Sequence, residues 1–476
     1  MRIGDIADGV TRGVEGIAAS MSETFLEPVI RLGVTGLSRA GKTVFITSLV
    51  ANLMERGRMP QLRAAASGAI SAAYLQPQPD NTVPRFDYET HLAALTGTDP
   101  HWPESTRAVS ELRLSMKVRP GGIGGLLGAV TGPRTVHLDI VDYPGEWLLD
   151  LALMERGYAE WSADTLARMR ERPGGVAFAA ALALADPGGK FDEVQAQGLA
   201  AAFTDALQAA REAGFSDCTP GRFLLPGELA GSPVLTFAPL PEPGAATPRG
   251  SLWREMERRY DAYKAEVVKP FFREHFSRID RQVVLVDALG AIHAGPRAVE
   301  DLRRAMTEIL GAFRPGRNAW LSQLLLGRRV EKILFAATKA DHLHHTQHPR
   351  LTAIIQALMR DARRRADFAG AETAAMAIAA LRATVEETRS RGGESYDCVR
   401  GTLLDTGREA ALYPGELPED PGQLLEAARD GAEAWLDAEY EVMRFAPARL
   451  TLRPGEGPPH IRLDKAAEFL LGDRLR

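Results

Sequence analysis

The clearest chemical signal in the sequence is a glycine-containing octapeptide close to the N-terminal end of the chain. Residues 36 to 43 read Gly-Leu-Ser-Arg-Ala-Gly-Lys-Thr and match the pattern GxxxxGK[ST] in full. Successive backbone N–H groups of such a loop point at a phosphate, the lysine reaches the β- and γ-phosphates, and the threonine hydroxyl binds Mg²⁺. The sequence therefore predicts a nucleoside triphosphate site with phosphate contacts from Ser38, Arg39, Ala40, Gly41, Lys42, Thr43 and Val44.

A second motif, Asp142-Tyr143-Pro144-Gly145, follows an apolar run at residues 135 to 141. An aspartate at the end of such a strand holds Mg²⁺, usually through a water, and the Gly145 N–H is placed to meet the γ-phosphate. Pro-Gly-Glu turns at residues 226 to 228 and 414 to 416 carry leucine in the place of Asp142. The aspartate therefore sets this copy apart and predicts a metal ligand.

A third motif, Thr338-Lys339-Ala340-Asp341, fits the pattern [NT]KxD and chooses the base. An aspartate there accepts two hydrogen bonds from guanine N1–H and N2–H₂, and adenine has no such pair of donors. We expect GTP or GDP, with base contacts from Thr338, Lys339, Asp341 and His342. The backbone of Ala380, Leu381 and Arg382, after the last core strand, is expected to cap the guanine O6.

Hydrolysis needs further groups near the γ-phosphate. Thr106 precedes an apolar run at residues 109 to 118 and is expected to close over Mg²⁺ and the γ-phosphate, with Ser105 and Thr82 as rivals. Lys42 and Gly145 are the other expected γ-phosphate contacts. We hypothesise that Arg39 supplies in cis the positive charge that other GTPases borrow from a finger or from potassium. The alternative is an arginine that faces solvent or pairs with a carboxylate.

Four histidines follow the third motif: His342, His344, His345 and His348. His344 and His348 are four residues apart and could share one helix face like a zinc pair. Because no cysteine or further carboxylate cluster completes a site, we interpret the segment as a solvated helix start, with adventitious metal binding as the alternative.

Alternating strands and helices must position these motifs, which indicates an α/β P-loop NTPase with a mainly parallel sheet and helices on both faces. Strands are expected at residues 30–34, 109–118, 135–141, 282–286, 332–337 and 376–381, and flanking helices at 44–54 and 296–313. The partial alternation at 109–118 and 135–141 predicts an antiparallel pair.

The chain divides into five expected parts. Residues 1–26 carry apolar residues three or four apart, typical of an amphipathic helix that packs on its own core or touches a membrane surface. Residues 27–146 and 281–394 form the two parts of the nucleotide-binding domain. Residues 147–280 form an inserted helical domain with an aromatic core, expected as helices at 148–170, 191–213 and 252–279. Residues 395–476 form a C-terminal α+β extension with short strands and a closing helix at 464–471.

The composition of the chain limits the classes of binding partner and the cellular compartment that we expect. The 476 residues carry a formal net charge of -5, so the chain has no basic field for nucleic acid. Two cysteines exclude a disulfide framework and fit a cytoplasmic location. No apolar run reaches the length of a membrane-spanning helix.

The order of the three motifs resembles the Ras-like branch of P-loop GTPases. Longer segments resemble the bacterial YcjX-like family, over nearly the whole chain: residues 31–39, 102–107, 142–147, 335–342 and 459–464. The resemblance implies a Ras-like G domain with a helical insertion between the second and third motifs, and a cytoplasmic nucleotide-binding stress protein described as an ATPase or a GTPase. It does not imply a biological target.

Two positions depart from the small-GTPase pattern. Glu146 stands where those enzymes carry the glutamine that orients water, so slow intrinsic hydrolysis is expected. Arg382 replaces the lysine of the usual guanine-capping loop. Our leading interpretation is a GTPase switch whose helical insertion reports the nucleotide state to a protein partner. The alternatives are an ATPase or P-loop kinase and a non-hydrolysing nucleotide-bound scaffold.

Overall fold

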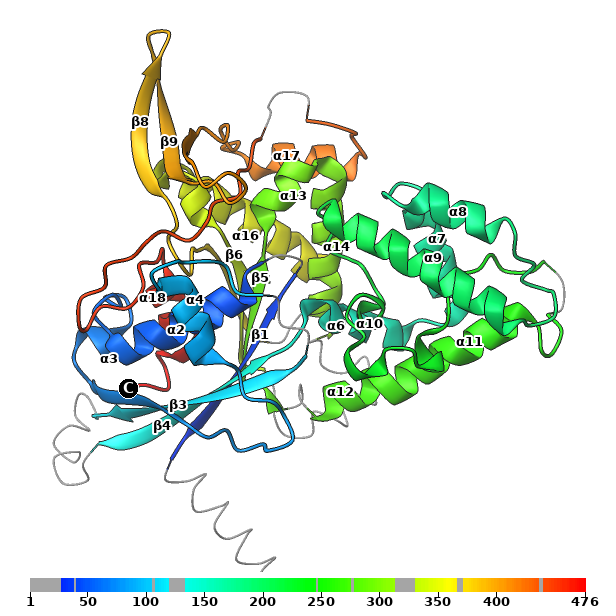
Figure 1. Ribbon diagram of the computed structural model, residues 1–476, viewed down its shortest axis with the longest axis horizontal. Coiled ribbons are helices and arrows are strands. Elements are labelled where there is room, and N and C mark those ends of the chain that lie inside the picture. The colour runs from blue at the N-terminus through cyan, green and yellow to red at the C-terminus, as the bar shows by residue number, and fades with distance from the viewer. Residues whose placement is uncertain are drawn as a thin grey trace, which may run out of the picture.

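A seven-stranded sheet forms the centre of the molecule (Figure 1). The computed structural model describes residues 27–37, 40–104, 108–119, 133–244, 247–274, 278–312, 330–365, 371–435 and 440–476. The strand order is β2-β3-β4-β1-β5-β6-β7, and the strands are β1 (Val29–Gly36), β2 (Ile70–Gln76), β3 (Ser110–Val118), β4 (Arg134–Asp142), β5 (Arg281–Val286), β6 (Lys332–Ala337) and β7 (Glu372–Ala377). The predicted helix at residues 1–26 lies outside the described residues.

The sheet is mostly parallel. β3 runs antiparallel to β2 and to β4, and the remaining neighbours, from β4 through β7, run parallel. The predicted antiparallel pair at residues 109–118 and 135–141 is therefore confirmed. β7 lies earlier than the predicted strand at 376–381, because the chain leaves the sheet after Ala377 and Ala379 pairs with Ile461 instead.

Helices cover both faces of the sheet, and alternate strand residues meet them. Val283 and Leu285 of β5 pack in the core that contains α2 (Lys42–Glu55) and α18 (Leu463–Leu471). Val284 and Val286 pack in the core that contains α13 (Ala288–Ala294), α14 (Pro296–Ala312) and α16 (His348–Arg365). This alternation follows from the period of two in a strand, which turns successive side chains to opposite faces. The shorter helices α3 (Arg63–Ala66), α4 (Tyr88–Thr96) and α17 (Pro421–Arg429) complete this part.

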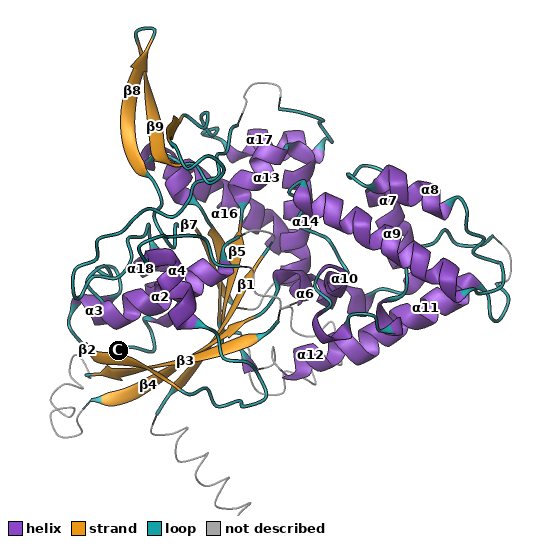
Figure 2. Ribbon diagram, in the orientation of Figure 1, coloured by secondary structure: helices purple, strands orange, loops and turns teal. Residues whose placement is uncertain are grey.

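A group of helices, the helical arm, is inserted in the sequence between β4 and β5 and extends from the sheet (Figure 2). It comprises α6 (Gly145–Leu149), a 3₁₀ segment (Asp150–Glu155), α7 (Tyr158–Met169), α8 (Gly175–Leu182), α9 (Glu193–Glu212), α10 (Gly221–Leu224), α11 (Leu252–Ala262), a π-helical turn (Tyr263–Val268) and α12 (Lys269–Glu274). Trp161 and Tyr260 stack in its core with ring centroids 4.9 Å apart, and Phe203, Phe237 and Tyr263 are fully buried around them. The aromatic residues are core, as predicted.

The predicted continuous helix at 148–170 is wrong, because the chain is extended at Arg156 and Gly157. The Arg156 carbonyl accepts hydrogen bonds from the Tyr260 hydroxyl at 3.2 Å and the Lys264 ammonium at 2.9 Å. In a continuous helix this carbonyl would accept a backbone N–H four residues later. Here tertiary contacts satisfy it, and a new helix, α7, begins at Tyr158.

Buried charges dock the helical arm on α14. Asp301 of α14 accepts hydrogen bonds from the backbone N–H groups of Ser216 at 2.6 Å and Asp217 at 2.9 Å, and it pairs with Arg172. All four residues are buried. Removing the partners of a buried carboxylate strongly destabilises a folded protein, so these bonds fix the position of the helical arm.

A three-stranded antiparallel sheet projects at the upper left of Figure 1. Its strands are β8 (Val385–Arg391), β9 (Glu394–Thr402) and β10 (Glu409–Leu412). The short strands predicted after residue 395 and the closing helix are confirmed, whereas β8 was not predicted, because its alternating charged residues carry little apolar signal.

Candidate functional site

A cavity of about 480 Å³ opens beyond the C-terminal ends of β1 and β6. Ligands of open α/β sheets bind at this edge, beyond the carboxyl ends of the strands. The structure brings residues of the first and third motifs together here, although they lie at opposite ends of the chain. The predicted site residues that line the cavity are Ala40, Gly41, Lys42, Thr43, Val44, Glu146, Thr338, Lys339, Asp341, His342, Ala380 and Leu381.

The cavity has two sides. The P-loop side comprises residues 36–44 and 142–146. Gly41 precedes α2 with φ of 76°, a left-handed conformation that glycine adopts without strain. The first turn of α2 then presents its unpaired N–H groups toward the cavity, an arrangement that suits a phosphate. Ser38, Arg39 and Thr106 lie outside the described residues, so their predicted roles stay predictions.

Lys42 and Asp142 meet on the P-loop side. The Lys42 ammonium is 3.1 Å from Asp142 Oδ1, and Asp142 is fully buried. Among the described residues, Asp142 Oδ2 has no hydrogen-bond partner. A buried, unpaired carboxylate oxygen is costly unless something binds it. A hard cation fits this oxygen together with the nearby hydroxyl of Thr43, because Mg²⁺ prefers oxygen ligands.

Gly145 and Glu146 are held between the P-loop and the helical arm. A Cβ on Gly145 would lie 2.1 Å from the Gly36 carbonyl oxygen, so only glycine fits this approach. On the other flank, a Cβ on Gly221 would lie 2.6 Å from the Glu146 carbonyl carbon. The Glu146 carboxylate is 3.1 Å from the guanidinium of Arg211 in the last turn of α9. The segment at Gly145 and Glu146 therefore contacts both the P-loop and the rest of the helical arm.

The Thr338 side comprises residues 338–342 and 379–382. Asp341 is buried, and its Oδ2 accepts the Ala383 N–H at 2.8 Å. Lys339 has φ of 60° and pairs with Asp287, the cap of α13. The Thr338 N–H donates to the Val286 carbonyl at 2.9 Å. A backbone hydrogen bond from Ala383 thus fixes the Asp341 carboxylate in the loop that follows β6.

The predicted solvated helix start after Asp341 is wrong for His342, His344 and His348, which are buried. His348 Nε2 lies 2.7 Å from the Ala340 carbonyl oxygen and 3.2 Å from that of Leu343. The Ala340 carbonyl also accepts the Leu343 N–H at 3.1 Å, so the imidazole adds a second bond to a carbonyl of the 3₁₀ turn. Burial lowers the pKa of His342 and of His348, so both are neutral at pH 7.

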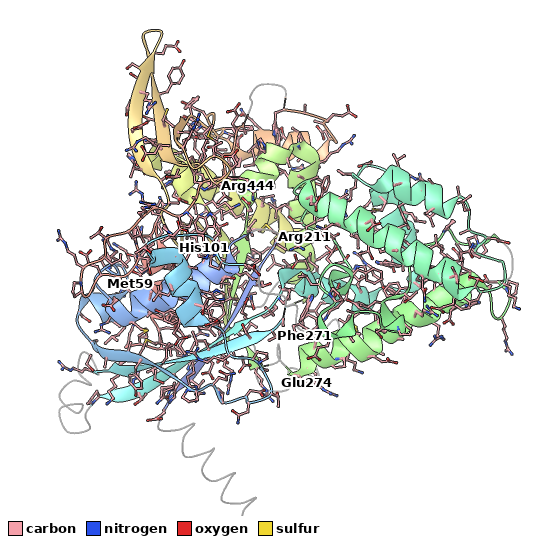
Figure 3. The ribbon with its side chains drawn as sticks, viewed as in Figure 1. Met59, His101, Arg211, Phe271, Glu274 and Arg444 are labelled. Atoms are coloured by element: carbon pink, nitrogen blue, oxygen red, sulfur yellow. The ribbon has the colours of Figure 1, made fainter. Side chains whose placement is uncertain are left out.

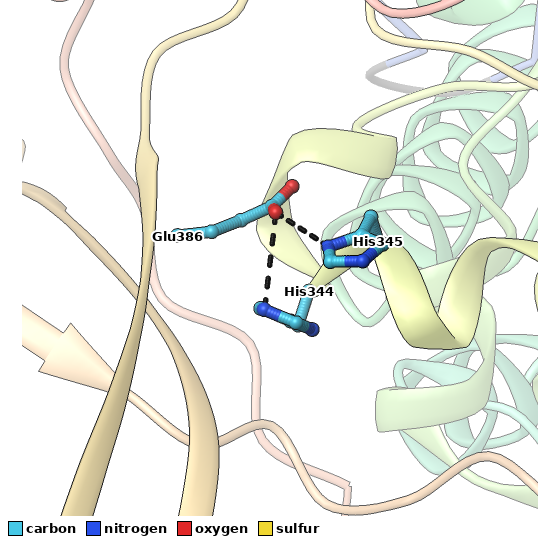
Figure 4. A group of neighbouring side chains, drawn as sticks. All are labelled: His344, His345 and Glu386. Atoms are coloured by element: carbon cyan, nitrogen blue, oxygen red, sulfur yellow. Dashed lines mark hydrogen bonds and ion pairs between the residues drawn. The ribbon is translucent and has the colours of Figure 1, made fainter.

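The alternative of a zinc pair formed by His344 and His348 is not supported either, because His348 Nε2 is committed to backbone carbonyls. His344 and His345 gather instead around Glu386 of β8 (Figure 4). This carboxylate comes from a strand that the sequence did not predict.

Arg382 is not among the described residues that line the cavity, and its predicted place in the guanine-capping loop stays a prediction. Arg382 Nε donates to the Thr384 carbonyl at 3.1 Å, and its guanidinium pairs with Glu386 at 3.3 Å. Ala380 and Leu381 still line the cavity. Their loop is held by residues 459–461, since the Arg382 N–H donates to Pro459 at 2.8 Å and Ala379 exchanges two backbone bonds with Ile461 at 3.0 and 2.8 Å.

A model of the YcjX-like family (DUF463) matches residues 30–475. The chain belongs to the YcjX-like family. It is 37% identical over 460 residues to the Ras-like GTPase YcjX of Escherichia coli K12, covering 94% of this chain and 96% of that protein. It is 35% identical over 470 residues to the Ras-like GTPase YcjX of Shewanella oneidensis, covering 94% of each. The mostly parallel sheet is consistent with these relatives. Within the described part of this YcjX-like chain, no helix is long and apolar enough to cross a membrane.

Sequence reasoning missed several residues that line the cavity of this YcjX-like chain: Trp102, Pro103, Arg211, Leu225, Leu404, Val442, Met443, Arg444 and Phe445. Arg211 and Arg444 are labelled in Figure 3. Trp102 Nε1 donates to the Phe445 carbonyl at 2.7 Å, and the Phe445 ring meets His342 edge-on at 5.2 Å between centroids. The signal for Trp102 was its place in a family-like segment, whereas Arg211 and Phe445 follow no motif.

Proposed function

We propose that this YcjX-like protein binds GTP with Mg²⁺ and hydrolyses it to GDP and phosphate. The observation that carries the proposal is the position of Asp341, a buried carboxylate on the same cavity as Lys42 and Thr43. Guanine offers two N–H donors to such a carboxylate, and adenine does not. The printed name of both relatives, Ras-like GTPase, points the same way.

On the P-loop side, each residue has a proposed task. The ammonium of Lys42 binds the β- and γ-phosphate oxygens, and the N–H groups from Ser38 to Val44 surround the phosphates. Thr43, Asp142 and Thr106 hold Mg²⁺, which neutralises phosphate charge when it is bound. The unpaired Asp142 Oδ2 supports this assignment.

Gly145 and Glu146 are the proposed groups around the attacking water, with Arg39 as a further cation. The Gly145 N–H binds the γ-phosphate, and the Glu146 carboxylate positions water. A carboxylate close to the γ-phosphate repels it, so we expect a slow intrinsic rate.

We further propose that residues 147–280 report the nucleotide state to a protein partner. The contacts of Gly145 with Gly36 and of Glu146 with Gly221 support this role, because they join the P-loop to the helical arm through two adjacent residues. The division into residues 27–146, 147–280, 281–394 and 395–476 belongs to the same proposal, as do a cytoplasmic location and a contact of residues 1–26 with their own core or a membrane surface.

Nucleotide competition tests the base and phosphate release tests the reaction. GTP and GDP should displace a labelled guanine nucleotide from the full chain, and ATP at the same concentration should not. Equal displacement by ATP would favour an ATPase and remove the assignment of Asp341. Guanine binding without any phosphate release would leave a nucleotide-bound scaffold in place of an enzyme.

A further inference from the structure

Arg211 is a positively charged residue that lines the cavity and belongs to no sequence motif. It lies in the last turn of α9, in the helical arm, and its side chain is 22% exposed. It lines the same cavity as Lys42 and Thr43, and its guanidinium is 3.1 Å from Glu146. Glu146 is buried, with 7% of its side chain exposed. The arm therefore brings a positive charge to the residue that follows the Asp142 motif.

An ordinary ion pair would be the simplest account of this contact, but its position argues for more. A guanidinium has five N–H donors in a fixed fork, so it binds one carboxylate oxygen and keeps donors for other acceptors. Glu146 without a partner would place an uncompensated negative charge beside the γ-phosphate. Arg211 reduces that repulsion and fixes the direction of the carboxylate.

We propose that Arg211 is a positioning residue for GTP hydrolysis, acting through Glu146, so that the helical arm completes the active site in cis. This inference rests on the proposed function. In the reaction, a water oxygen attacks the γ-phosphorus and the bond from that phosphorus to the bridging oxygen breaks. The bridging oxygen leaves with the electron pair on GDP, and the proton of the water goes to a γ-phosphate oxygen. Arg211 holds Glu146 where it orients that water.

The test compares Arg211→Ala with the wild type in single-turnover hydrolysis and GTP binding. Loss of positioning should lower kcat by about 10- to 100-fold and leave the GTP Kd within about threefold. Arg211→Lys should recover part of the rate. Arg254→Ala is the control, since Arg254 is exposed and pairs with Glu257 on the same arm.

A double-mutant cycle keeps the inference testable where Arg211→Ala disturbs the arm. If Arg211 acts through Glu146, the Arg211→Ala/Glu146→Gln variant should be no slower than Glu146→Gln alone. Additive losses, or an Arg211→Ala variant with the wild-type kcat, would overturn the inference. A wild type that binds GTP and releases no phosphate would instead overturn the proposed hydrolysis.

A separate group of side chains carries a second inference, independent of the nucleotide. His344 Nε2 lies 3.8 Å from Glu386 Oε2, and His345 Nδ1 lies 2.7 Å from the same oxygen (Figure 4). The ligand atoms of the three residues lie within 4.8 Å of one another. His344 Nδ1 is 3.0 Å from the Thr346 hydroxyl and 3.4 Å from Asp397. The Asp397 carboxylate favours hydrogen on Nδ1, which leaves the Nε2 lone pair facing Glu386.

A lone pair that faces a carboxylate oxygen is repulsive unless a cation lies between them. Tetrahedral zinc, with ligand bonds of about 2.0 to 2.2 Å, separates its ligand atoms by about 3.4 Å. The distance of 3.8 Å from His344 Nε2 to Glu386 Oε2 is close to this value. The exposed His345 ring has to move away from Glu386 Oε2 by about 0.7 Å. We propose that His344, His345 and Glu386 bind a divalent transition metal such as Zn²⁺, which fixes β8 to the segment after Asp341.

Equilibrium dialysis of Zn²⁺ against the full chain without a histidine tag, with Mg²⁺ in excess, tests the metal site. The wild type should bind one Zn²⁺ that His344→Ala and Glu386→Gln each weaken by more than about 30-fold. His101→Ala is the control, since His101 is exposed and its Nδ1 lies 3.1 Å from the carbonyl of Asp99 in its own loop. No Zn²⁺ binding at pH 7.5, or equal binding by all variants, would reduce the group to protonated ion pairs and overturn the proposal.

Discussion

The P-loop side and the Thr338 side of the cavity are built in different ways. The P-loop side comes from segments that directly follow the neighbouring strands β1 and β4, and the ion pair of Lys42 with Asp142 joins them. The Thr338 side follows β6 and β7 but is held by residues 459–461 and bordered by residues 442–445. Two sequence motifs form the first side, whereas the second side needs backbone that is distant in the sequence. We therefore expect the first to determine affinity and the second to determine selectivity.

The largest expected effect is on the P-loop side. Lys42→Ala should weaken GTP and GDP alike by more than about 100-fold, because charge-assisted bonds to phosphate are lost. Isothermal titration calorimetry measures both Kd values. Lys117→Ala serves as the control, since Lys117 is exposed on β3. An unchanged Kd in a folded Lys42→Ala protein would show that affinity does not come from this side.

Asp341→Asn tests the Thr338 side. GTP should bind about 30- to 100-fold more weakly, and xanthosine triphosphate should gain, because the amide pairs with the xanthine carbonyl. The Ala383 N–H keeps an acceptor in the asparagine oxygen, so the loop should hold. Competition with both nucleotides gives the ratio, and the exposed Asp405→Asn is the matched control. A uniform loss for every base would contradict the assigned selectivity.

Asn52 links the two sides, and its substitution should weaken nucleotide binding less than the substitutions at Lys42 and Asp341. Its side-chain amide on α2 donates to the carbonyls of Ser48 at 2.9 Å and Pro458 at 3.0 Å. Asn52→Ala should cost about 1 to 3 kcal/mol of unfolding free energy, because the buried carbonyl of Pro458 loses its partner. The GTP Kd should rise by about three- to tenfold without a change in base preference. Urea unfolding and titration of Asn52→Ala beside the exposed Asn81→Ala measure both; an altered base preference would argue against a purely supporting role.

A further effect concerns Asp150, which joins three segments of the helical arm. It accepts the Gly221 N–H at 2.9 Å and the Tyr263 hydroxyl at 2.6 Å. Burial raises the pKa of Asp150 from its ordinary 3.8 to about 7. The folded protein thus keeps a proton that the unfolded chain has released, so its stabilisation is full below pH ~4 and is lost as the pH rises toward about 7.

Asp150→Asn should therefore flatten the fall of unfolding free energy with pH, by at most about 1.4 kcal/mol per pH unit. Urea unfolding at several pH values, compared with the exposed Asp205→Asn on α9, checks this. A variant whose stability follows the same pH slope as the wild type would assign that slope to other buried carboxyls.

Much of the framework could be predicted from the sequence, because motifs that bind phosphate need fixed residue types after fixed strands. β6 has the predicted bounds, and α14 and β4 differ by a residue or so. The missed features depend on backbone pairing. Residues 459–461 hold the Ala380 loop through main-chain groups, which leave no side-chain pattern. The side chains of Arg382 and His348 make local contacts that a reading of charge does not predict: Arg382 with Thr384 and Glu386, and His348 with the carbonyls of Ala340 and Leu343.

The bond between Asn52 and Pro458 joins residues that are 406 positions apart. At a synthesis rate of roughly 5 to 20 residues per second, the ribosome needs about 20 to 80 s to pass from one to the other. The glycine-rich loop and its helix are thus made long before the segment that closes the other side. Pro458 and the residues after it, which hold the other side of the cavity, are therefore among the last to be synthesised.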